Sequence, residues 1–174
     1  MADAEILLEN FNKALGEVEQ AKKAILLLSR ESESSIRALY RLALYMLHQE
    51  HDLEGATQIL SKIAACTLKS ETRSQARISY AFTLLARQQA ESAISMLNRV
   101  VSEESNPSIQ ALALDYLVTF MQENGNSKPA VANMNEKRIM VLRDLVNEES
   151  DRKLKADYQL RLDAAMAERE NSIS

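Results

Sequence analysis

Apolar residues recur along this chain at intervals of three and four positions, which is the spacing of one face of an α-helix. Three segments show the pattern most clearly, and each predicts an amphipathic helix that buries one face. The three stripes are Leu53, Ala56, Ile59, Leu60, Ile63 and Ala64; Ala90, Ala93, Ile94, Leu97, Val100 and Val101; and Ile109, Leu112, Ala113, Tyr116, Leu117 and Phe120. The segment 35–48 is apolar on nearly all sides, so we expect it to be covered on more than one side.

Capping residues separate these segments. Asp52 and Asn106-Pro107 have the residue types that begin helices, and Gly125 has the type that ends one. Pro129 and Ser150-Asp151 mark two further helix starts. The predicted helices lie near 3–14, 17–30, 35–48, 53–66, 71–86, 90–102, 107–123, 130–147 and 151–169, and the first two can also form one continuous helix.

The composition favours the same fold class. The chain has 174 residues, of which only three are glycine and two are proline. Sheet proteins need many turn residues, whereas the abundant residues here are good helix formers. We therefore expect an all-α protein, folded as one domain over residues 1–174.

A short repeat is visible in the helical pattern. Ala21, Ala56 and Ala93 are each followed four residues later by an aliphatic side chain, and a further step of 37 residues after Ala93 reaches Ala130. A small residue in the first turns of a helix allows a neighbouring helix axis to approach closely. We therefore predict that the pair Gly55-Ala56 is the close-contact point of a helical hairpin.

At this point the chain resembles the tetratricopeptide repeat family, whose repeat is a pair of antiparallel helices. The matching positions are Tyr40, Gly16 with Ala21, Ala56 with Leu60, and Ala93 with Leu97. The chain departs from the family pattern at several places: Leu44 and Ala81 replace a glycine of the first helix, Arg77 replaces an aromatic residue, and one closing proline is absent.

The resemblance implies a right-handed α-solenoid of antiparallel helical hairpins. It would contain about four hairpins in residues 3–147, closed by a C-terminal capping helix over 151–169. In such a fold the first helix of each hairpin faces a concave groove that binds a peptide or a helix of a partner. The partner-binding residues implied in this way are Arg41, Tyr45, His48, Gln75, Ile78, Phe82, Asp115 and Thr119. The alternative for Tyr45 and Phe82 is that they pack in the core.

Charge and cysteine content narrow the choice of partner and compartment. The net charge is −4, which argues against a nucleic-acid ligand. No apolar run is long enough to cross a membrane. A single cysteine, Cys66, excludes an internal disulfide, and the first residues do not have the pattern of a signal peptide, so we expect a cytoplasmic protein.

The sequence offers no catalytic or metal-binding motif. His48 and His51 are the only histidines, too few for a zinc site built on rigid elements. Cys66 lies in the apolar stretch "KIAACTL", which is typical of a packing residue rather than a nucleophile. No glycine-rich phosphate loop is present. We therefore expect that the protein binds no cofactor and no metal and has no enzyme activity.

These observations favour a protein–protein interaction module, such as an adaptor, a scaffold or a chaperone-like protein. Two other classes remain open. One is a compact helical bundle that self-associates, forming a homodimer through the stripes in 6–15 and 151–166. The other is an enzyme or ligand-binding domain with a pocket among Tyr40, Tyr80 and Tyr116, for which the sequence offers no titratable partner.

Overall fold

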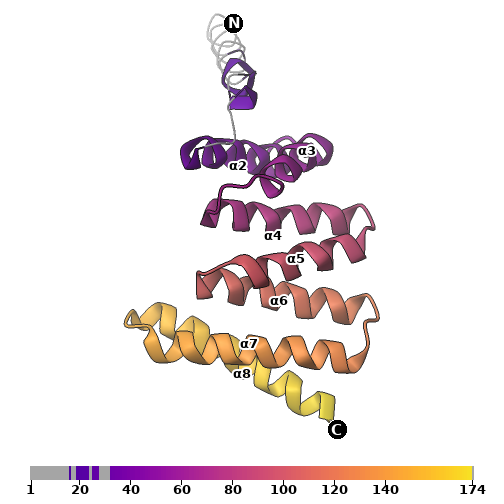
Figure 1. Ribbon diagram of the computed structural model, residues 1–174, viewed down its shortest axis with the longest axis vertical. Coiled ribbons are helices and arrows are strands. Elements are labelled where there is room, and N and C mark those ends of the chain that lie inside the picture. The colour runs from indigo at the N-terminus through magenta and orange to yellow at the C-terminus, as the bar shows by residue number, and fades with distance from the viewer. Residues whose placement is uncertain (1–15, 17–18, 24, 28–31, 174) are drawn as a thin grey trace, which may run out of the picture. The chain divides into compact units, whose positions relative to one another are not determined.

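Helices make up nearly all of the described chain, as the hydrophobic pattern predicts. The computed structural model describes residues 16, 19–23, 25–27 and 32–173, and no strand occurs within these residues. The predicted helix over 3–14 lies outside the described residues, as does part of the one over 17–30. From residue 32 onward the helices are α2 (Glu33–His48), α3 (Leu53–Ala64), α4 (Glu71–Ala86), α5 (Ala90–Glu103), α6 (Pro107–Glu123), α7 (Lys128–Glu148) and α8 (Arg152–Ile173) (Figure 1). No helix in this part of the chain has both the length and the hydrophobicity to cross a bilayer.

The predicted capping residues begin the helices. The Asp52 carboxylate accepts a hydrogen bond from the Gly55 N–H at 2.8 Å, and the Asn106 side chain accepts one from the Ser108 N–H at 2.9 Å. Asp151 accepts from two backbone N–H groups in the first turns of α8. Each bond satisfies a donor that has no partner within its own helix, which explains why the predicted starts are accurate.

One residue with a left-handed backbone lies in each of three turns between helices, before α3, α5 and α7. His51, Gln88 and Gly125 have φ values of 55°, 60° and 70°, and their positions are spaced by 37 residues. The Gln89 N–H bonds to the Leu84 carbonyl, and the Asn126 N–H bonds to the Met121 carbonyl, each at a spacing of five residues. This bond follows a left-handed residue in the Schellman motif that commonly ends a helix. The structure therefore shows the repeat as a left-handed residue that recurs in the turns. In the sequence only Gly125 has a residue type that indicates such a turn.

The chain divides into two compact units, Met1–Arg73 and Ser74–Ser174. In the first unit α2 packs against α3. A Cβ atom at Gly55 would collide with the methyl group of Met46 on α2 and with the Asp52 carboxylate, and Ala56 is fully buried. The prediction that Gly55-Ala56 is a close-contact point between two helices is therefore confirmed.

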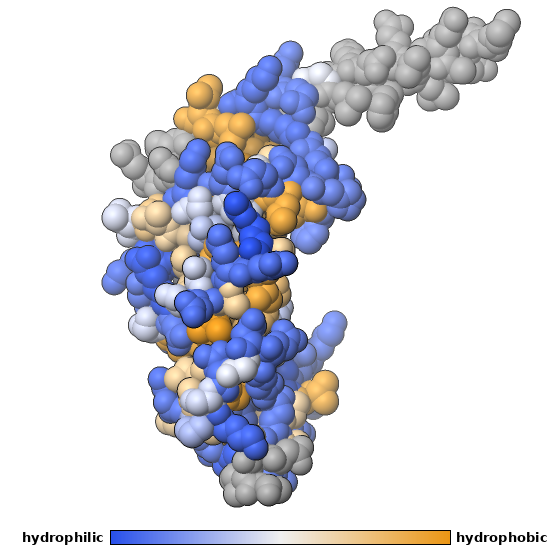
Figure 2. All heavy atoms as spheres, turned by 90° about the vertical axis from the view of Figure 1, so that its right-hand side faces the viewer, coloured by the Kyte–Doolittle hydropathy of each residue, from blue (hydrophilic) through white to orange (hydrophobic). Residues whose placement is uncertain are grey.

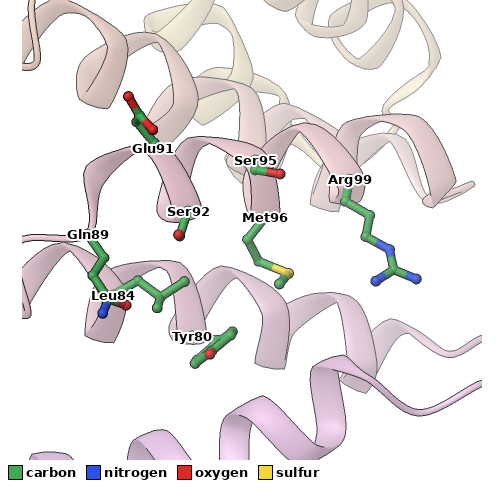
Figure 3. A pocket seen from close by; sticks show the side chains of 8 residues that line it. All are labelled: Tyr80, Leu84, Gln89, Glu91, Ser92, Ser95, Met96 and Arg99. Carbon is green, nitrogen blue, oxygen red and sulfur yellow. The ribbon is translucent and has the colours of Figure 1, made fainter.

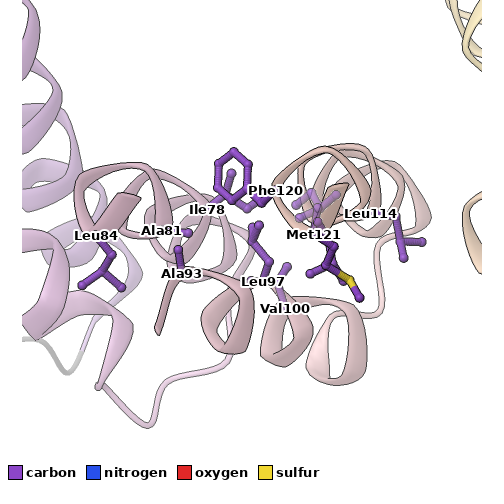
Figure 4. Close-up of a cluster of buried hydrophobic side chains, with 12 residues drawn as sticks. Ile78, Ala81, Leu84, Ala93, Leu97, Val100, Leu114, Phe120 and Met121 are labelled. Atoms are coloured by element: carbon purple, nitrogen blue, oxygen red, sulfur yellow. The ribbon is translucent and has the colours of Figure 1, made fainter. Parts of the chain in front are cut away.

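In the second unit α4, α5, α6 and α7 follow one another as antiparallel helices (Figure 1). Buried aliphatic side chains of α4, α5 and α6 form one core, together with Phe120 and Met121 at the end of α6 (Figure 4). Its fully buried members include Ala81, Ala93, Leu97, Val100, Ala113 and Leu117. The alanines lie where helices meet, so small side chains permit close packing here as well.

The last helix, α8, packs against α7 through a smaller core. Tyr158, Leu162 and Ala165 of α8 are buried there with Ile139 and Leu142 of α7. These three residues belong to the apolar stripe predicted in the C-terminal segment. Within the second unit the stripe therefore covers α7.

Polar contacts add to the attachment of α8. The Tyr158 hydroxyl lies 2.8 Å from the Ser108 hydroxyl, and the Asn135 amide donates to the Ala165 carbonyl at 2.9 Å. Arg138 on α7 is 5% exposed and donates to the Glu168 carboxylate of α8 at 2.8 Å. Hydrogen bonds and an ion pair therefore stabilise the attachment of α8, in addition to the burial of its apolar side chains.

Candidate functional site

The predicted partner-binding residues of the first unit lie together on α2. Arg41, Tyr45 and His48 are all exposed and are spaced by four and three residues, which places them on one helix face. The Tyr45 ring is 39% exposed and has the Lys22 ammonium 5.8 Å from its centroid. Lys22 also forms an ion pair with Glu50. This face therefore presents the Tyr45 ring together with the cationic side chains of Arg41 and Lys22.

In the second unit the structure brings Phe82 of α4 against α6. The Phe82 ring meets Tyr116 edge to face, with centroids 4.6 Å apart, and meets Phe120 at 5.3 Å. Phe82 remains 39% exposed, so it is both a packing residue and a surface residue. Gln75 on α4 and Thr119 on α6 are exposed as well. We call Gln75, Phe82, Tyr116 and Thr119 the aromatic face.

Two other predicted residues have roles within the second unit. Ile78 is 5% exposed and belongs to the core of α4, α5 and α6, so its side chain is not offered to a partner. Asp115 forms ion pairs with Arg161 at 2.7 Å and Arg138 at 3.7 Å. Burial raises the pKa of the Asp115 carboxyl, and the two guanidinium groups oppose that rise. Asp115 thus joins α6 to α7 and α8.

A groove between α4 and α5 is the candidate binding cavity (Figure 3). Its volume is about 490 Å³. Tyr80 and Leu84 of α4 face Met96 of α5 across it, and these three side chains give it apolar walls. The polar lining residues are Gln89, Glu91, Ser92, Ser95 and Arg99. A cavity with apolar walls and several polar groups is the usual form of a ligand site.

A second hollow lies on the other side of α5. It has a volume of about 610 Å³ and is formed by α5 and the turn between α6 and α7. Its lining is rich in amide side chains, with Asn98 on α5 and Asn124 and Asn126 in the turn. Glu91 and Ser95 line both cavities, so one helix separates them.

A charged cluster anchors one end of the α4–α5 groove. Arg77 is fully buried and donates from Nη1 to Glu103 Oε2 at 2.7 Å, while Arg99 donates from Nε to Glu103 Oε1 at 2.6 Å. The hydrogen bonds from Arg99 and Arg77 lower the pKa of Glu103 from 4.5 to about 2. Glu103 is therefore charged at neutral pH and fixes the Arg99 side chain at the rim of the groove.

The other groups that the sequence offers for chemistry lie in several places within the described residues. No group of three or more His, Cys, Asp or Glu side chains suited to a metal lies in this part of the chain. Cys66 is a half-buried free thiol. Tyr80 lines the α4–α5 groove and Tyr116 belongs to the aromatic face, whereas Tyr40 lies in the first unit.

Sequence reasoning missed most of the groove. Ser92, Ser95 and Arg99 are exposed polar residues of an amphipathic helix, and nothing in the sequence distinguishes them from a solvated face. The apolar pattern predicts that Tyr116 lies in a buried stripe, but its contact with Phe82 depends on the packing of α4 against α6.

Figure 2 shows another face of the molecule, on which polar side chains predominate and apolar ones form small separated groups. Models of known protein families, curated protein sequences and solved structures were compared with the chain, and none of the three comparisons gave a match.

Proposed function

We propose that this chain is a protein–protein interaction module that binds a peptide or helix of a partner on the faces of its first helices. We also propose that its hairpins continue from one unit to the next as a right-handed α-solenoid. The recurrence of the left-handed turn at His51, Gln88 and Gly125 supports a repeat architecture. A repeat architecture does not determine function, which depends on the residues at the surface.

The single observation that carries the proposal is the exposure of Phe82. A phenylalanine held in place by Tyr116 and Phe120, yet 39% exposed, is an ordered aromatic side chain on a surface. Ordered aromatic side chains lose little entropy on binding and are enriched among the residues that dominate interfaces. Arg41 and Tyr45 give the first unit a surface of the same chemistry.

The test begins with affinity capture and continues with one captured partner, purified and titrated against variants. We expect Phe82→Ala to weaken binding by at least about tenfold, since the few residues that dominate an interface cost about 2 kcal/mol or more when truncated. Leu160→Ala is the matched control, because Leu160 is 70% exposed on α8 and is not part of the aromatic face. Each variant is first checked for helicity by circular dichroism.

Two results would contradict the proposal. If neither Phe82→Ala nor Tyr45→Ala weakens the binding of the partner, the aromatic surfaces are not the binding surface. If solution mass and small-angle scattering show a compact dimer instead of an extended monomer, a self-associating structural subunit becomes the better interpretation.

A further inference from the structure

The turn between α6 and α7 contains a dipeptide that can modify itself chemically, Asn124-Gly125 (Figure 1). In such a pair the backbone nitrogen of the second residue can attack the side-chain amide of the first, and glycine has no side chain to hinder the attack. The two earlier left-handed turns have Glu50 and Arg87 in the position of Asn124, and neither of these side chains carries an amide. Of the three turns, the one between α6 and α7 is therefore the one that can undergo this reaction.

The reaction exchanges one bond to the Asn124 Cγ atom for another. The Gly125 nitrogen bonds to Cγ, the bond from Cγ to Nδ2 breaks, and ammonia leaves with the proton that the Gly125 amide has lost. Water then opens the resulting five-membered succinimide ring at either of its two carbonyl groups. Opening at the side-chain carbonyl gives aspartate. Opening at the backbone carbonyl gives isoaspartate, in which the main chain runs through Cβ and Cγ.

In the folded chain the backbone conformation of Asn124 keeps the two reacting atoms apart. Its ψ is 17°, so the Gly125 nitrogen is almost eclipsed with the Asn124 nitrogen and does not lie on the side of Cβ. Because the peptide unit is rigid, only rotation about ψ, by roughly a third of a turn, can bring the Gly125 nitrogen to Cγ. The ring therefore cannot close in the turn as the structure has it.

Three hydrogen bonds oppose this rotation. The Gly125 N–H donates to the Gln122 carbonyl at 3.3 Å, and the N–H of the following residue donates to the Met121 carbonyl at 3.0 Å. The Asn124 Nδ2 group, which would leave as ammonia, donates to the Phe120 carbonyl at 2.8 Å. Both the attacking and the leaving nitrogen are thus bound to carbonyls of α6, so the reaction requires a local opening of the turn.

The products do not fit the closed turn. Aspartate in place of Asn124 has no N–H to donate to the Phe120 carbonyl. Its charge would lie at the C-terminal end of α6, where the helix carbonyls already carry partial negative charge, and beside the hollow that Glu91 lines. Isoaspartate adds a carbon atom to the main chain, which disturbs the bonds that end the helix.

We propose that Asn124-Gly125 is a deamidation site, which the closed α6–α7 turn protects and which reacts when the turn opens. Conversion to aspartate or isoaspartate removes bonds that close the turn, so the modified turn stays open for a larger fraction of the time. The modified fraction of the protein therefore rises with the time that the turn has spent open. This inference does not depend on the proposed function.

The test compares the full chain at neutral pH with the peptide acetyl-Gln-Glu-Asn-Gly-Asn-Ser-Lys-amide, which has the sequence of residues 122–128. Mass spectrometry of proteolytic fragments locates the modified residue, and an isoaspartate-specific methyltransferase measures the isoaspartate. We expect the reaction at Asn124, at least about tenfold slower in the folded protein than in the peptide. In urea that unfolds the protein, the rates in protein and peptide should agree.

Amide hydrogen exchange makes the comparison quantitative. The Asn126 N–H must lose its bond to the Met121 carbonyl before it exchanges, and the same bond must break before the ring at Asn124 closes. The slowing of deamidation relative to the peptide should therefore agree with the slowing of exchange at Asn126 to within about threefold. Asn106 is an internal control that should stay unmodified, because Pro107 has no N–H to react.

The consequence for the fold is tested with Asn124→Asp, which introduces the charge of one product directly. This variant should unfold at a lower urea concentration than the wild type and should show faster amide exchange at the end of α6. Asn133→Asp, at an exposed position inside α7, is the matched control and should have a smaller effect on both measurements.

Four results would overturn the inference. They are no reaction at Asn124 in the unfolded protein, equal rates in the folded protein and the peptide, a slowing of deamidation that disagrees with the exchange of Asn126, and an unchanged urea midpoint in Asn124→Asp. None of these results bears on the Phe82→Ala titration, which tests the proposed function separately.

Discussion

The ring of Phe82 stands edge-on to the ring of Tyr116 at an interplanar angle of 83°, although the whole of α5 separates the two residues in the sequence. This contact shows that α4 and α6 lie next to each other within the second unit. It also means that the surface of α4 cannot be changed at Phe82 without affecting α6.

The first prediction concerns the energy of this contact. Edge-to-face aromatic pairs contribute about 0.5–1.5 kcal/mol beyond the area that they bury. In a double-mutant cycle of Phe82→Ala and Tyr116→Ala, the sum of the two single losses should exceed the loss in the double variant by that amount. Urea denaturation followed by circular dichroism measures it. If the two losses in unfolding free energy are strictly additive, the two rings lie close together but their contact does not stabilise the fold.

The second prediction concerns the left-handed turns. Gln88→Gly should raise the stability of the second unit by about 1 kcal/mol, because glycine adopts a positive φ without a steric cost. Gly125→Ala should lower it by a similar amount. A Cβ atom at Gly125 meets nothing within 4 Å, so backbone conformation is the only cause there.

The control for these two variants is Gln122→Gly, the same substitution at an exposed position within α6. Glycine inside a helix is destabilising, so this control should change the urea midpoint in the direction opposite to Gln88→Gly. If both substitutions destabilise, the left-handed backbone at Gln88 is not a source of strain.

The third prediction concerns acid stability. Because the folded-state pKa of Glu103 is about 2, below the ordinary 4.5, the stabilisation that it provides is fully present above pH 4.5. It is lost as the pH falls from 4.5 towards 2. Glu103→Gln should therefore cost about 1–2 kcal/mol at pH 7, a value reduced for the solvent screening of a one-third exposed carboxylate.

The measurement is the difference in unfolding free energy between the wild type and Glu103→Gln at several pH values. The difference should be constant from pH 7 to about 5 and should shrink below that. The exposed Glu148→Gln on α7 serves as the control and should give a small difference throughout. A difference for Glu103→Gln that grows as the pH falls would contradict the assigned role of Arg77 and Arg99.

The fourth prediction concerns the attachment of α8. Asp115 accepts a hydrogen bond from Arg161 Nε at 2.9 Å and also lies near the buried Arg138. Asp115→Asn should weaken the attachment by about 1–2 kcal/mol, since bonds between charged groups are among the stronger ones. Amide hydrogen exchange in α8 should then be about 5- to 30-fold faster, with α5 unchanged.

Asp144→Asn, at an exposed position of α7, is the matched control for this experiment. Equal acceleration in α5 and α8 would mean that α8 unfolds only together with the rest of the unit. In that case the ion pairs of Asp115 stabilise the whole unit and not the attachment of one helix.

The sequence predicts the helices well and the surfaces poorly, for physical reasons. Helix starts depend on local capping bonds, such as that of Asp52, and these can be identified from residue type. The close contact at Gly55 follows from similar reasoning, because glycine inside a helix costs about 1 kcal/mol relative to alanine and a closely approaching neighbour can offset that cost. The left-handed turns at His51 and Gln88 have no glycine to mark them.

Surfaces depend on which helices become neighbours. The resemblance to a repeat family predicts that Ile78 lies in a groove, yet its side chain is buried in the core of its own unit. The fully buried Arg77 interrupts the apolar stripe of α4, and this makes the orientation of that helix hard to predict. Its partner Glu103 lies on the next helix, beyond the reach of a local pattern.

The recurrence of the left-handed turn every 37 residues has a consequence for how such a chain can change in length. A duplication of residues 89–125 would join Gly125 to a second Gln89, so a left-handed residue would again precede the start of α5. A deletion of the same segment would join Gln88 to Asn126 at an equivalent point in the turn. Unequal crossing-over between repeats would then add or remove a pair of helices, and the new join would lie in a turn of the same type. Each added copy would bring another α5 and with it another copy of the polar residues of the groove.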